Sequence, residues 1–248
     1  MLGVILAGGT GSRLKPLTQV TNKHLLPIYK KPMIFYPLEF LKKIGISEVA
    51  IVTGREFAGD FANLFGNGCE YGVDFTYKVQ EGALGIAQAI GLVERIARNE
   101  PILVILGDNI FMLDDKEYEE IKELLDRFST DPKGATIFLK EVPDPQRFGV
   151  VEFDKDGNVI SIEEKPEVPK SNCISTGIYL YDHTVFDKIK TLKPSRRGEL
   201  EVTDLNSCYL SEGGLKCYRV KGEWIDAGTF ESLHRANILA KKVEDYRI

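Results

Sequence analysis

The fold is decided near the start of the chain by residues 2–14, which read LGVILAGGTGSRL. Leu2–Leu6 has the length and apolar character of a buried β-strand, and three glycines follow it within five residues. Glycine lets a backbone turn sharply and approach a ligand closely, so that its N–H groups can face a phosphate. The sequence therefore predicts a strand that leads into a phosphate-binding loop.

Two familiar phosphate-binding loops do not fit this stretch. The dinucleotide-binding fingerprint needs a third glycine where this loop has Ser12 and Arg13, and the P-loop ends in Gly-Lys-Ser/Thr. Arg13 instead places a cation in the loop, and Lys23 follows ten residues later. Such cations favour chemistry at phosphorus, where positioning and charge stabilisation lower the barrier. On the glycines alone, a purely structural tight turn is equally compatible.

Strand-length apolar runs alternate with helical patterns up to about residue 140. Strands are expected at Leu2–Leu6, Val49–Thr53, Phe75–Val79, Ile102–Leu106 and Ala135–Leu139, and helices at Met33–Lys43, Glu56–Phe65, Leu84–Ala97 and Lys116–Phe128. This alternation predicts an α/β, Rossmann-like three-layer fold with a mixed, mainly parallel central sheet. Ligands of such sheets bind beyond the carboxyl ends of the strands.

The pattern changes after about residue 140. Gly149–Phe153 and Val159–Glu163 are joined by residues 154–158, whose Asp-Gly step indicates a hairpin, and Ile174–Tyr181 reads as a further strand. Helices are expected at Val202–Ser211, capped by Asp204, and at Thr229–Val243. Because no flexible linker interrupts the chain, we expect one domain, residues 1–248, with halves at 1–140 and 141–248 and a smaller antiparallel lobe in the second.

Composition narrows the classes of function. The net charge of -5 argues against a nucleic-acid-binding surface, which needs a concentrated basic face. The four cysteines are not paired at zinc-binding spacing, so free thiols are expected. No signal-peptide pattern and no apolar stretch of ~20 residues is present, which predicts a cytoplasmic protein without a membrane anchor. We expect no catalytic role for any of the three histidines.

Further motifs recur in a fixed order along the chain. Lys23 precedes Leu25-Leu26-Pro27, and residues 31–38 read KPMIFYPL; the later motifs are LGDN at 106–109, RFGVVEF at 147–153, EEKP at 163–166, RGELEVTD at 197–204 and WIDAGT at 224–229. Together with the glycine-rich loop, they resemble the nucleoside-diphosphate-sugar pyrophosphorylases, and within them the thymidylyltransferases. This resemblance implies transfer of a nucleotidyl group from dTTP to a sugar 1-phosphate, glucose 1-phosphate in the first place, with release of pyrophosphate.

The resemblance also implies which residues act. Arg13, Lys23 and Lys165 would be catalytic, and Asp108 and Asp226 would bind Mg2+, a hard cation that prefers oxygen ligands. The nucleotide contacts would be Leu6, Ala7, Gly8, Gly9, Thr10, Gly11, Ser12, Gln80, Gly85 and Asp108. The sugar contacts would be Asn109, Gly149, Glu164, Lys165, Ser175 and Thr176. The resemblance thus implies that residues 1–140 form the nucleotide-binding half and residues 141–248 the sugar-binding and metal half. The amide of Gln80 offers the donor and acceptor that a pyrimidine edge requires.

Three departures from the thymidylyltransferase pattern leave alternatives open. Residues 81–85 read EGALG where those enzymes usually carry PSPDG, Phe148 replaces a tyrosine, and Ser175 stands at a usually apolar position. The first departure leaves UTP as the alternative nucleotide, and the other two leave another hexose 1-phosphate as the alternative to glucose 1-phosphate. A metal-dependent glycosyltransferase and a non-catalytic regulatory subunit of the same fold are the rival functions. Homo-oligomers are expected, and because the chain ends at Ile248, ahead of a C-terminal extension known in the family, feedback inhibition stays open.

Overall fold

The computed structural model describes residues 1–245, and the chain contacts divide it into two compact units. Unit 1 contains residues 1–2, 84–104 and 125–221, and unit 2 contains residues 3–83, 105–124 and Gly222 onward. Each unit therefore combines segments that lie far apart in the sequence. Strands β1 (Leu2–Ala7) and β6 (Ile102–Leu106) and helix α5 (Asp115–Thr130) contain residues of both units.

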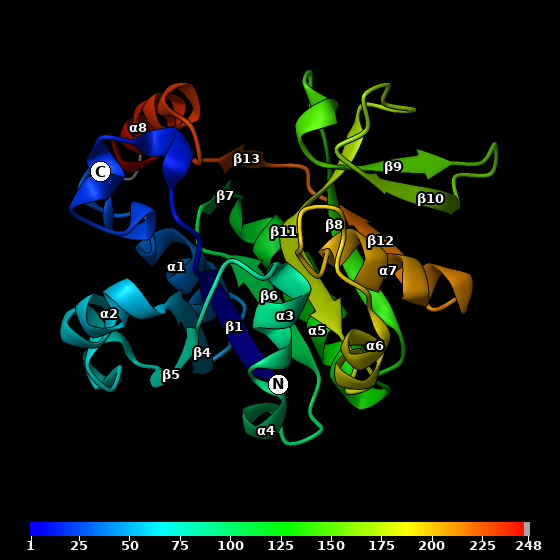
Figure 1. Ribbon diagram of the computed structural model, residues 1–248, viewed down its shortest axis with the longest axis horizontal. Helices are drawn as coiled ribbons and strands as arrows, with labels where there is room; N and C mark the ends of the chain where they lie inside the picture. Colours follow the sequence, from blue (N-terminus) through cyan, green and yellow to red (C-terminus); the bar gives the residue numbers. More distant parts are fainter. Residues whose placement is uncertain (246–248) are drawn as a thin grey trace. The chain divides into compact units, whose positions relative to one another are not determined.

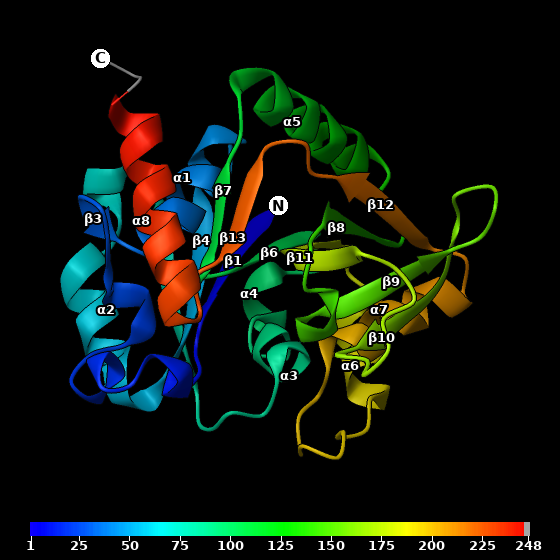
Figure 2. The same cartoon turned by 90° about the horizontal axis from the view of Figure 1, so that it is seen from above.

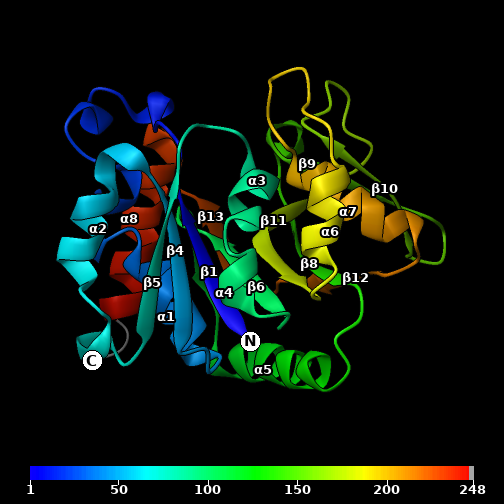
Figure 3. The ribbon, with the colours of Figure 1, turned by 60° about the horizontal axis from the view of Figure 1, so that its bottom comes forward.

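Parallel strands form the centre of unit 2. They are β1 (Leu2–Ala7), β4 (Glu48–Gly54) and β5 (Asp74–Gln80), which Figure 3 shows side by side. Every residue of β1 is buried, as its apolar sequence predicts. Helices α1 (Phe35–Lys43) and α2 (Ala58–Phe65) belong to this unit, and α2 packs against β5. The carboxyl ends of β1, β4 and β5 thus lie at one edge, where the glycine-rich loop begins.

Short antiparallel pairs complete unit 2. Strand β7 (Asn109–Met112) pairs with β13 (Glu223–Asp226), and β2 (Pro27–Ile28) pairs with β3 (Lys31–Pro32). Helix α8 (Phe230–Asp245) lies against β2 and β13 (Figure 2). Their apolar side chains form one core cluster that includes Leu14, Ile110 and Ile225. The β7–β13 pair fixes how the segments around residues 108 and 226 meet.

Unit 1 is built mainly on antiparallel pairs. Its strands are β8 (Ala135–Glu141), β9 (Gly149–Phe153), β10 (Val159–Glu164), β11 (Cys173–Tyr181) and β12 (Leu215–Arg219). They pair in the order β10-β9-β11-β8-β12, and the β12–β8 pair alone in this row is parallel. The helices are α3 (Ile86–Gly91), α4 (Glu94–Ala97), α6 (Val185–Thr191) and α7 (Val202–Ser211), and α7 packs against β10 (Figure 1).

The structure confirms the predicted α/β class with a mixed sheet and an antiparallel lobe. Glycine just past the end of a helix favours a left-handed cap, and Gly45 after α1 has a φ of +85°. The predicted helix Leu84–Ala97 is wrong in its continuity, because Leu92 and Val93 separate α3 from α4. The predicted roles of residues 1–140 in nucleotide binding and of residues 141–248 in sugar and metal binding stay predictions. Among the described residues, no helix is both long and apolar enough to span a membrane.

The predicted cap of α7 is also wrong. Asp204 lies inside the first helical turn, and Glu201 occupies the N-cap position without a capping side-chain hydrogen bond. The Glu201 carboxylate is held instead by the Ser195 hydroxyl at 2.6 Å and by the Arg197 guanidinium at 2.8 Å. The Glu201 side chain is therefore engaged by residues outside the helix and does not cap it.

Candidate active site

The glycine-rich loop leaves β1 at Ala7 and needs two of its glycines for conformation. Gly9 and Gly11 have φ angles of +92° and +59°, a region that side chains disfavour. The Gly11 carbonyl accepts a hydrogen bond from the Thr18 hydroxyl at 2.8 Å. Leu14 is fully buried, while Arg13 is exposed beside it. The loop is thus anchored at both ends and leaves the Arg13 side chain accessible to a ligand.

Gln80 lies close to this loop at the carboxyl end of β5. A Cβ atom on Gly8 would come within 2.9 Å of Gln80 Oε1, so only glycine leaves the amide its place. An adjoining cavity of about 550 Å³ is lined by Gln80 and by residues of the glycine-rich loop, of 54–57 and of 81–83. This volume lies within the range of small-molecule sites. Unit 2 by itself therefore brings the predicted phosphate loop and the predicted base-reading glutamine to one cavity.

Asp108 is a buried carboxylate that pairs with Lys23. It follows β6, and the Lys23 ammonium donates a hydrogen bond to its Oδ2, while the Asn109 amide donates to Oδ1 at 3.1 Å. Burial alone would raise the pKa of Asp108, but the positive charge of Lys23 and these hydrogen bonds outweigh it and hold the pKa well below its usual value. Asp108 is therefore ionised and charge-paired.

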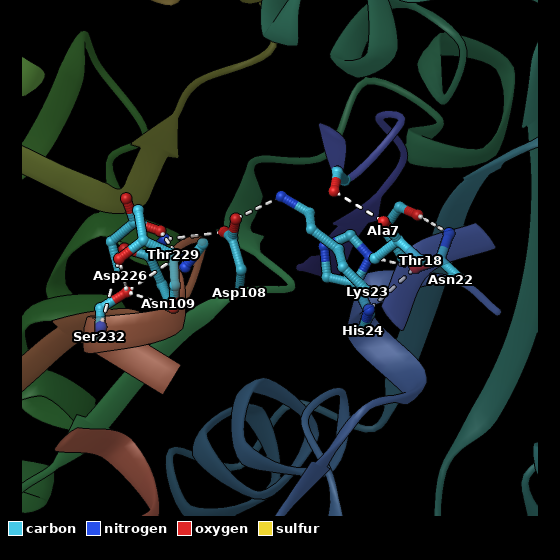
Figure 4. A network of polar contacts seen from close by, with 12 residues as sticks. Ala7, Thr18, Asn22, Lys23, His24, Asp108, Asn109, Asp226, Thr229 and Ser232 are labelled. Carbon is cyan, nitrogen blue, oxygen red and sulfur yellow. Dashed lines mark hydrogen bonds and ion pairs between the residues drawn. The ribbon is translucent and has the colours of Figure 1, made fainter. Parts of the chain in front are cut away.

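Asp226 joins the same group through the β7–β13 pair. It lies opposite Asn109 in the strand register, and the Ala227 N–H donates to the Asp108 carbonyl at 2.8 Å. Figure 4 shows Asp108 between Lys23 on one side and Asn109 and Asp226 on the other. Burial and the negative charge of Asp108 raise the pKa of Asp226. The two carboxylates are therefore close enough for their negative charges to repel each other.

Arg13 also reaches this group. A Cβ atom on Gly228 would lie 2.9 Å from both Arg13 Nη2 and Asp226 Oδ1, which places the guanidinium and the carboxylate over the same glycine. The positive charges of Lys23 and Arg13 both act to lower the pKa of Asp226. We call Arg13, Lys23, Asp108 and Asp226 the charged centre. It contains two cations and two carboxylates.

The charged centre fits the Mg2+ ion that the family implies. Its two carboxylates supply the oxygen ligands that Mg2+ prefers, and a divalent cation would relieve the repulsion that raises the pKa of Asp226. Among the described residues, no group of three or more His, Cys, Asp and Glu side chains could hold a metal. This agrees with the usual Mg2+ site, in which one or two carboxylates are joined by substrate phosphates and water.

Asn22 and His24 form a buried pair next to Lys23 that the sequence did not predict. The side-chain Oδ1 of Asn22 accepts hydrogen bonds from both the backbone N–H of His24, at 2.9 Å, and the His24 ring Nδ1, at 2.7 Å. The Asn22 amide nitrogen donates to the Ala7 carbonyl at 3.3 Å, where the phosphate loop starts. Burial and the Lys23 charge lower the pKa of His24 to about 3, so its ring is neutral with the proton on Nδ1. Only the adjacency of these residues to Lys23 signalled them.

Unit 1 aligns three of the six predicted sugar contacts. Glu164 on β10 lies opposite Gly149 on β9, which in turn lies opposite Ser175 on β11. These three predicted residues therefore form one row across three strands. Thr176, the next residue along β11, is buried, and its hydroxyl donates to the Phe138 carbonyl at 2.9 Å. Strand alternation turns its side chain to the opposite face.

Lys165 has an unusual backbone at the end of this row. Its φ of +46° lies in the left-handed region, which costs a non-glycine residue roughly 1–2 kcal/mol. Its N–H donates to the Phe148 carbonyl at 3.0 Å, and its ammonium lies 3.1 Å from Glu164 Oε1. The surrounding structure thus enforces a strained conformation at a predicted catalytic residue.

Gly85 and Asn109, two of the predicted ligand contacts, have contacts within the protein that give no evidence of a ligand. Gly85, in unit 1, has a φ of +98°, and a Cβ there would lie 2.3 Å from the Leu200 carbonyl oxygen, so packing alone requires glycine. The Asn109 amide is engaged at both ends, by Asp108 and by the Trp224 indole N–H at 2.7 Å. Contacts of these two residues with nucleotide or sugar stay predictions.

Comparison with known proteins identifies the family. Residues 2–242 match the model of the nucleotidyl transferase family, and this chain belongs to that family. The glucose-1-phosphate thymidylyltransferase of Neisseria meningitidis is 42% identical over 99% of this chain and 84% of its own length. The enzyme of that name from Xanthomonas campestris is 45% identical over 94% of this chain and 78% of its own length.

Solved structures agree. A Bacillus anthracis protein assigned as a glucose-1-phosphate thymidylyltransferase, crystallised with sucrose, matches with a TM-score of 0.89 at 51% identity, over 97% of this chain and 95% of that one. A UDP-glucose pyrophosphorylase bound to UDP-glucose matches with a TM-score of 0.85 at 25% identity, over 97% and 98% of the two chains. The predicted membership and the predicted class of enzyme, a nucleotidyltransferase, are confirmed.

Proposed function

We propose that this enzyme transfers the nucleotidyl group of dTTP to glucose 1-phosphate, giving dTDP-glucose and pyrophosphate. The relatives that bear the name glucose-1-phosphate thymidylyltransferase support the choice of both substrates. The observation that carries the proposal is the charged centre, because it places two cations and two carboxylates, Asp108 buried and Asp226 half-buried, beside a glycine-rich loop. Such a group suits the displacement of pyrophosphate from a nucleotide.

The proposed reaction is a direct displacement at the α-phosphorus. A phosphate oxygen of the sugar 1-phosphate forms the new P–O bond, and the bond to the pyrophosphate oxygen breaks with its electron pair leaving on pyrophosphate. That attacking oxygen is already anionic, so no general base is required. Alignment and charge neutralisation are then the main tasks of the enzyme. This agrees with a charged centre that contains no acid–base histidine, since His24 is held neutral.

Within unit 2, each charged residue has a proposed task. The exposed Arg13 guanidinium would neutralise charge that develops on the departing pyrophosphate. Lys23, already paired with Asp108, would bind phosphate oxygens beside it. Asp108 and Asp226 would hold Mg2+, which supplies charge neutralisation and orientation of the phosphates when bound. The loop N–H groups of residues 8–12 would bind the nucleotide phosphates.

Within unit 1, the aligned row would bind the sugar 1-phosphate. Lys165 would bind its phosphate, and Glu164 would accept hydrogen bonds from sugar hydroxyls. Gly149, which has no side chain, leaves space in the row between Glu164 and Ser175. Charge-assisted hydrogen bonds of this kind are stronger than neutral ones, so Glu164 and Lys165 would contribute most of the sugar affinity.

UTP is the second candidate nucleotide. The fold is shared with a UDP-glucose pyrophosphorylase, and residues 81–84 beside Gln80 depart from the thymidylyltransferase pattern. Thymine and uracil differ by one methyl group, and a pocket distinguishes such groups by only ~1–3 kcal/mol. We propose dTTP as the better substrate, with UTP used less efficiently.

A substrate matrix tests the proposal. Purified enzyme with Mg2+ is offered dTTP or UTP against glucose, galactose and mannose 1-phosphates, and pyrophosphate release is measured. We expect the highest kcat/KM for dTTP with glucose 1-phosphate. Failure of every pair would favour the non-catalytic regulatory subunit, and sugar transfer without pyrophosphate release would favour the glycosyltransferase. The cytoplasm and a homo-oligomeric state remain predictions.

A further inference from the structure

Thr203 makes a hydrogen bond to the proposed sugar-binding carboxylate. Its hydroxyl donates to Glu164 Oε2 at 2.6 Å, within the short range expected when the acceptor is ionised. Thr203 is buried in the first turn of α7, whereas Glu164 is half-buried at the end of β10. A fixed residue of the helix thus contacts the more accessible residue of the strand.

The two oxygens of Glu164 have different partners. Oε2 faces Thr203, while Oε1 lies 3.1 Å from Lys165 Nζ and 3.5 Å from Arg197 Nη2. Arg197 is held in turn by Glu201, with Nη2 2.8 Å from Oε2 of that residue. Rotation of the Glu164 carboxylate would break the Thr203 bond and displace Oε1 from both cations. The Thr203 hydroxyl therefore selects one orientation of the carboxylate.

Gly149 leaves the room that this contact needs. It lies directly opposite Glu164 in the β9–β10 pair, and a Cβ there would sit 3.2 Å from Thr203 Oγ1 and 3.7 Å from Glu164 Oε2. The first distance is tighter than nearly all ordinary Cβ contacts. A side chain at this position would press on the hydroxyl that holds the carboxylate, so the contact depends on glycine in the neighbouring strand.

We propose that Thr203 is a positioning residue for sugar recognition: its hydroxyl fixes the Glu164 carboxylate in the orientation that accepts a hydroxyl of the sugar 1-phosphate. This inference rests on the proposed binding of a sugar 1-phosphate by Glu164. Thr203 itself does not touch the substrate. A purely structural tie between α7 and β10 would need the same bond, so the test must separate recognition from stability.

The test compares Thr203→Val, which keeps the shape and removes the hydroxyl, with Thr203→Ser, which restores it. We expect Thr203→Val to raise KM for glucose 1-phosphate about tenfold, the scale of one hydrogen bond to a charged group. KM for dTTP should stay unchanged, and Thr203→Ser should return KM for the sugar to within about twofold of wild type.

Thr184→Val is the matched control. The Thr184 hydroxyl also donates to a carboxylate at 2.6 Å, that of Asp182, in the same unit. Its loss should lower the midpoint of thermal unfolding without changing KM for either substrate. An unchanged sugar KM in Thr203→Val, or equal rises in both KM values, would overturn the positioning role.

A panel of glucose 1-phosphates, each lacking one ring hydroxyl, identifies the group that Glu164 accepts. For the analogue without that hydroxyl, wild type and Thr203→Val should have the same KM; an undiminished difference for every analogue would contradict the proposal. If wild type releases no pyrophosphate with any substrate pair, the proposed function fails, and calorimetric Kd values for glucose 1-phosphate then test Thr203 by the same comparison.

Discussion

The charged centre of unit 2 and the Glu164 group of unit 1 both combine carboxylates with cations, but they differ in exposure. The Lys23 and Asp108 side chains are 16% and 11% exposed, whereas those of Lys165, Glu164 and Arg197 are 47%, 26% and 45% exposed. Charges interact more strongly where water is excluded. The buried Lys23–Asp108 pair is therefore suited to stabilising a transition state, and the more exposed Glu164 group to reversible binding of a sugar. Substitutions should separate these effects into kcat and KM.

Asp108→Asn should have the largest effect. It removes a charge from the centre and leaves Lys23 without its ionic partner, so kcat should fall by about 10²–10³-fold. Breaking a buried ion pair from one side should also cost about 3 kcal/mol of unfolding free energy. Steady-state rates and urea unfolding measure the two quantities. Near-wild-type kcat at saturating Mg2+ would remove Asp108 from the proposed mechanism.

Arg13→Ala should lower kcat about a hundredfold, as expected for loss of one preorganised group that stabilises developing charge. Arg13 is exposed, so the midpoint of urea unfolding should barely change. This variant sharpens the comparison, because it separates catalysis from stability within the charged centre. Lys15→Ala, an exposed cation nearby in the same loop region, is the control and should retain more activity.

His24→Gln tests whether burial beside the charged centre lowers the pKa of His24. The folded-state pKa of about 3 lies below the ordinary value of 6.5, so the unfolded chain binds an extra proton as pH falls below that value. Wild-type stability from this residue is therefore present above about pH 6.5 and lost on acidification. Between about pH 6 and 4, wild type should lose ~1.4 kcal/mol per pH unit more than His24→Gln in metal-free buffer. Equal slopes in urea unfolding would show that His24 titrates normally.

The smallest expected effect is the difference in stability between Lys165→Gly and Lys165→Ala. Both remove the ammonium and should raise KM for glucose 1-phosphate alike. Glycine adopts the observed φ of +46° without strain, so the glycine variant should be more stable than the alanine variant by about 1 kcal/mol. Thermal unfolding of the two proteins measures this difference. A more stable alanine variant would contradict the left-handed backbone at Lys165.

The sequence predicted the parts of the fold that have strong local patterns. The all-apolar β1, the Asp-Gly hairpin between β9 and β10 and the glycine cap at Gly45 all follow from local chemistry. Strand β12 was missed because Leu215–Arg219 is partly exposed and carries no alternating pattern. The sequence also could not reveal that residues 84–104 join unit 1 while Gly222 onward joins unit 2, because such grouping depends on long-range packing.

The candidate site shows the same limit. Asp108 and Asp226 stood out through their motifs, and the β7–β13 pair brings them together. Thr203 lies in the RGELEVTD motif, but a threonine at a helix start is ordinary, and its proposed role depends on a strand that ends 39 positions earlier. The contacts of Asn22 and His24 could not be predicted either. The hydrogen bonds between these two residues and from Asn22 to Ala7 form only in the folded chain.

In the proposed reaction, the residues of the charged centre promote direct transfer of a nucleotidyl group to a sugar 1-phosphate. The most direct measurement follows pyrophosphate and dTDP-glucose together, in one reaction of the wild-type enzyme with dTTP, glucose 1-phosphate and Mg2+. Direct transfer should give equal amounts of both products at every time point, and no pyrophosphate when the sugar phosphate is omitted. Pyrophosphate formed without the sugar phosphate, or a sugar nucleotide formed without pyrophosphate, would contradict it.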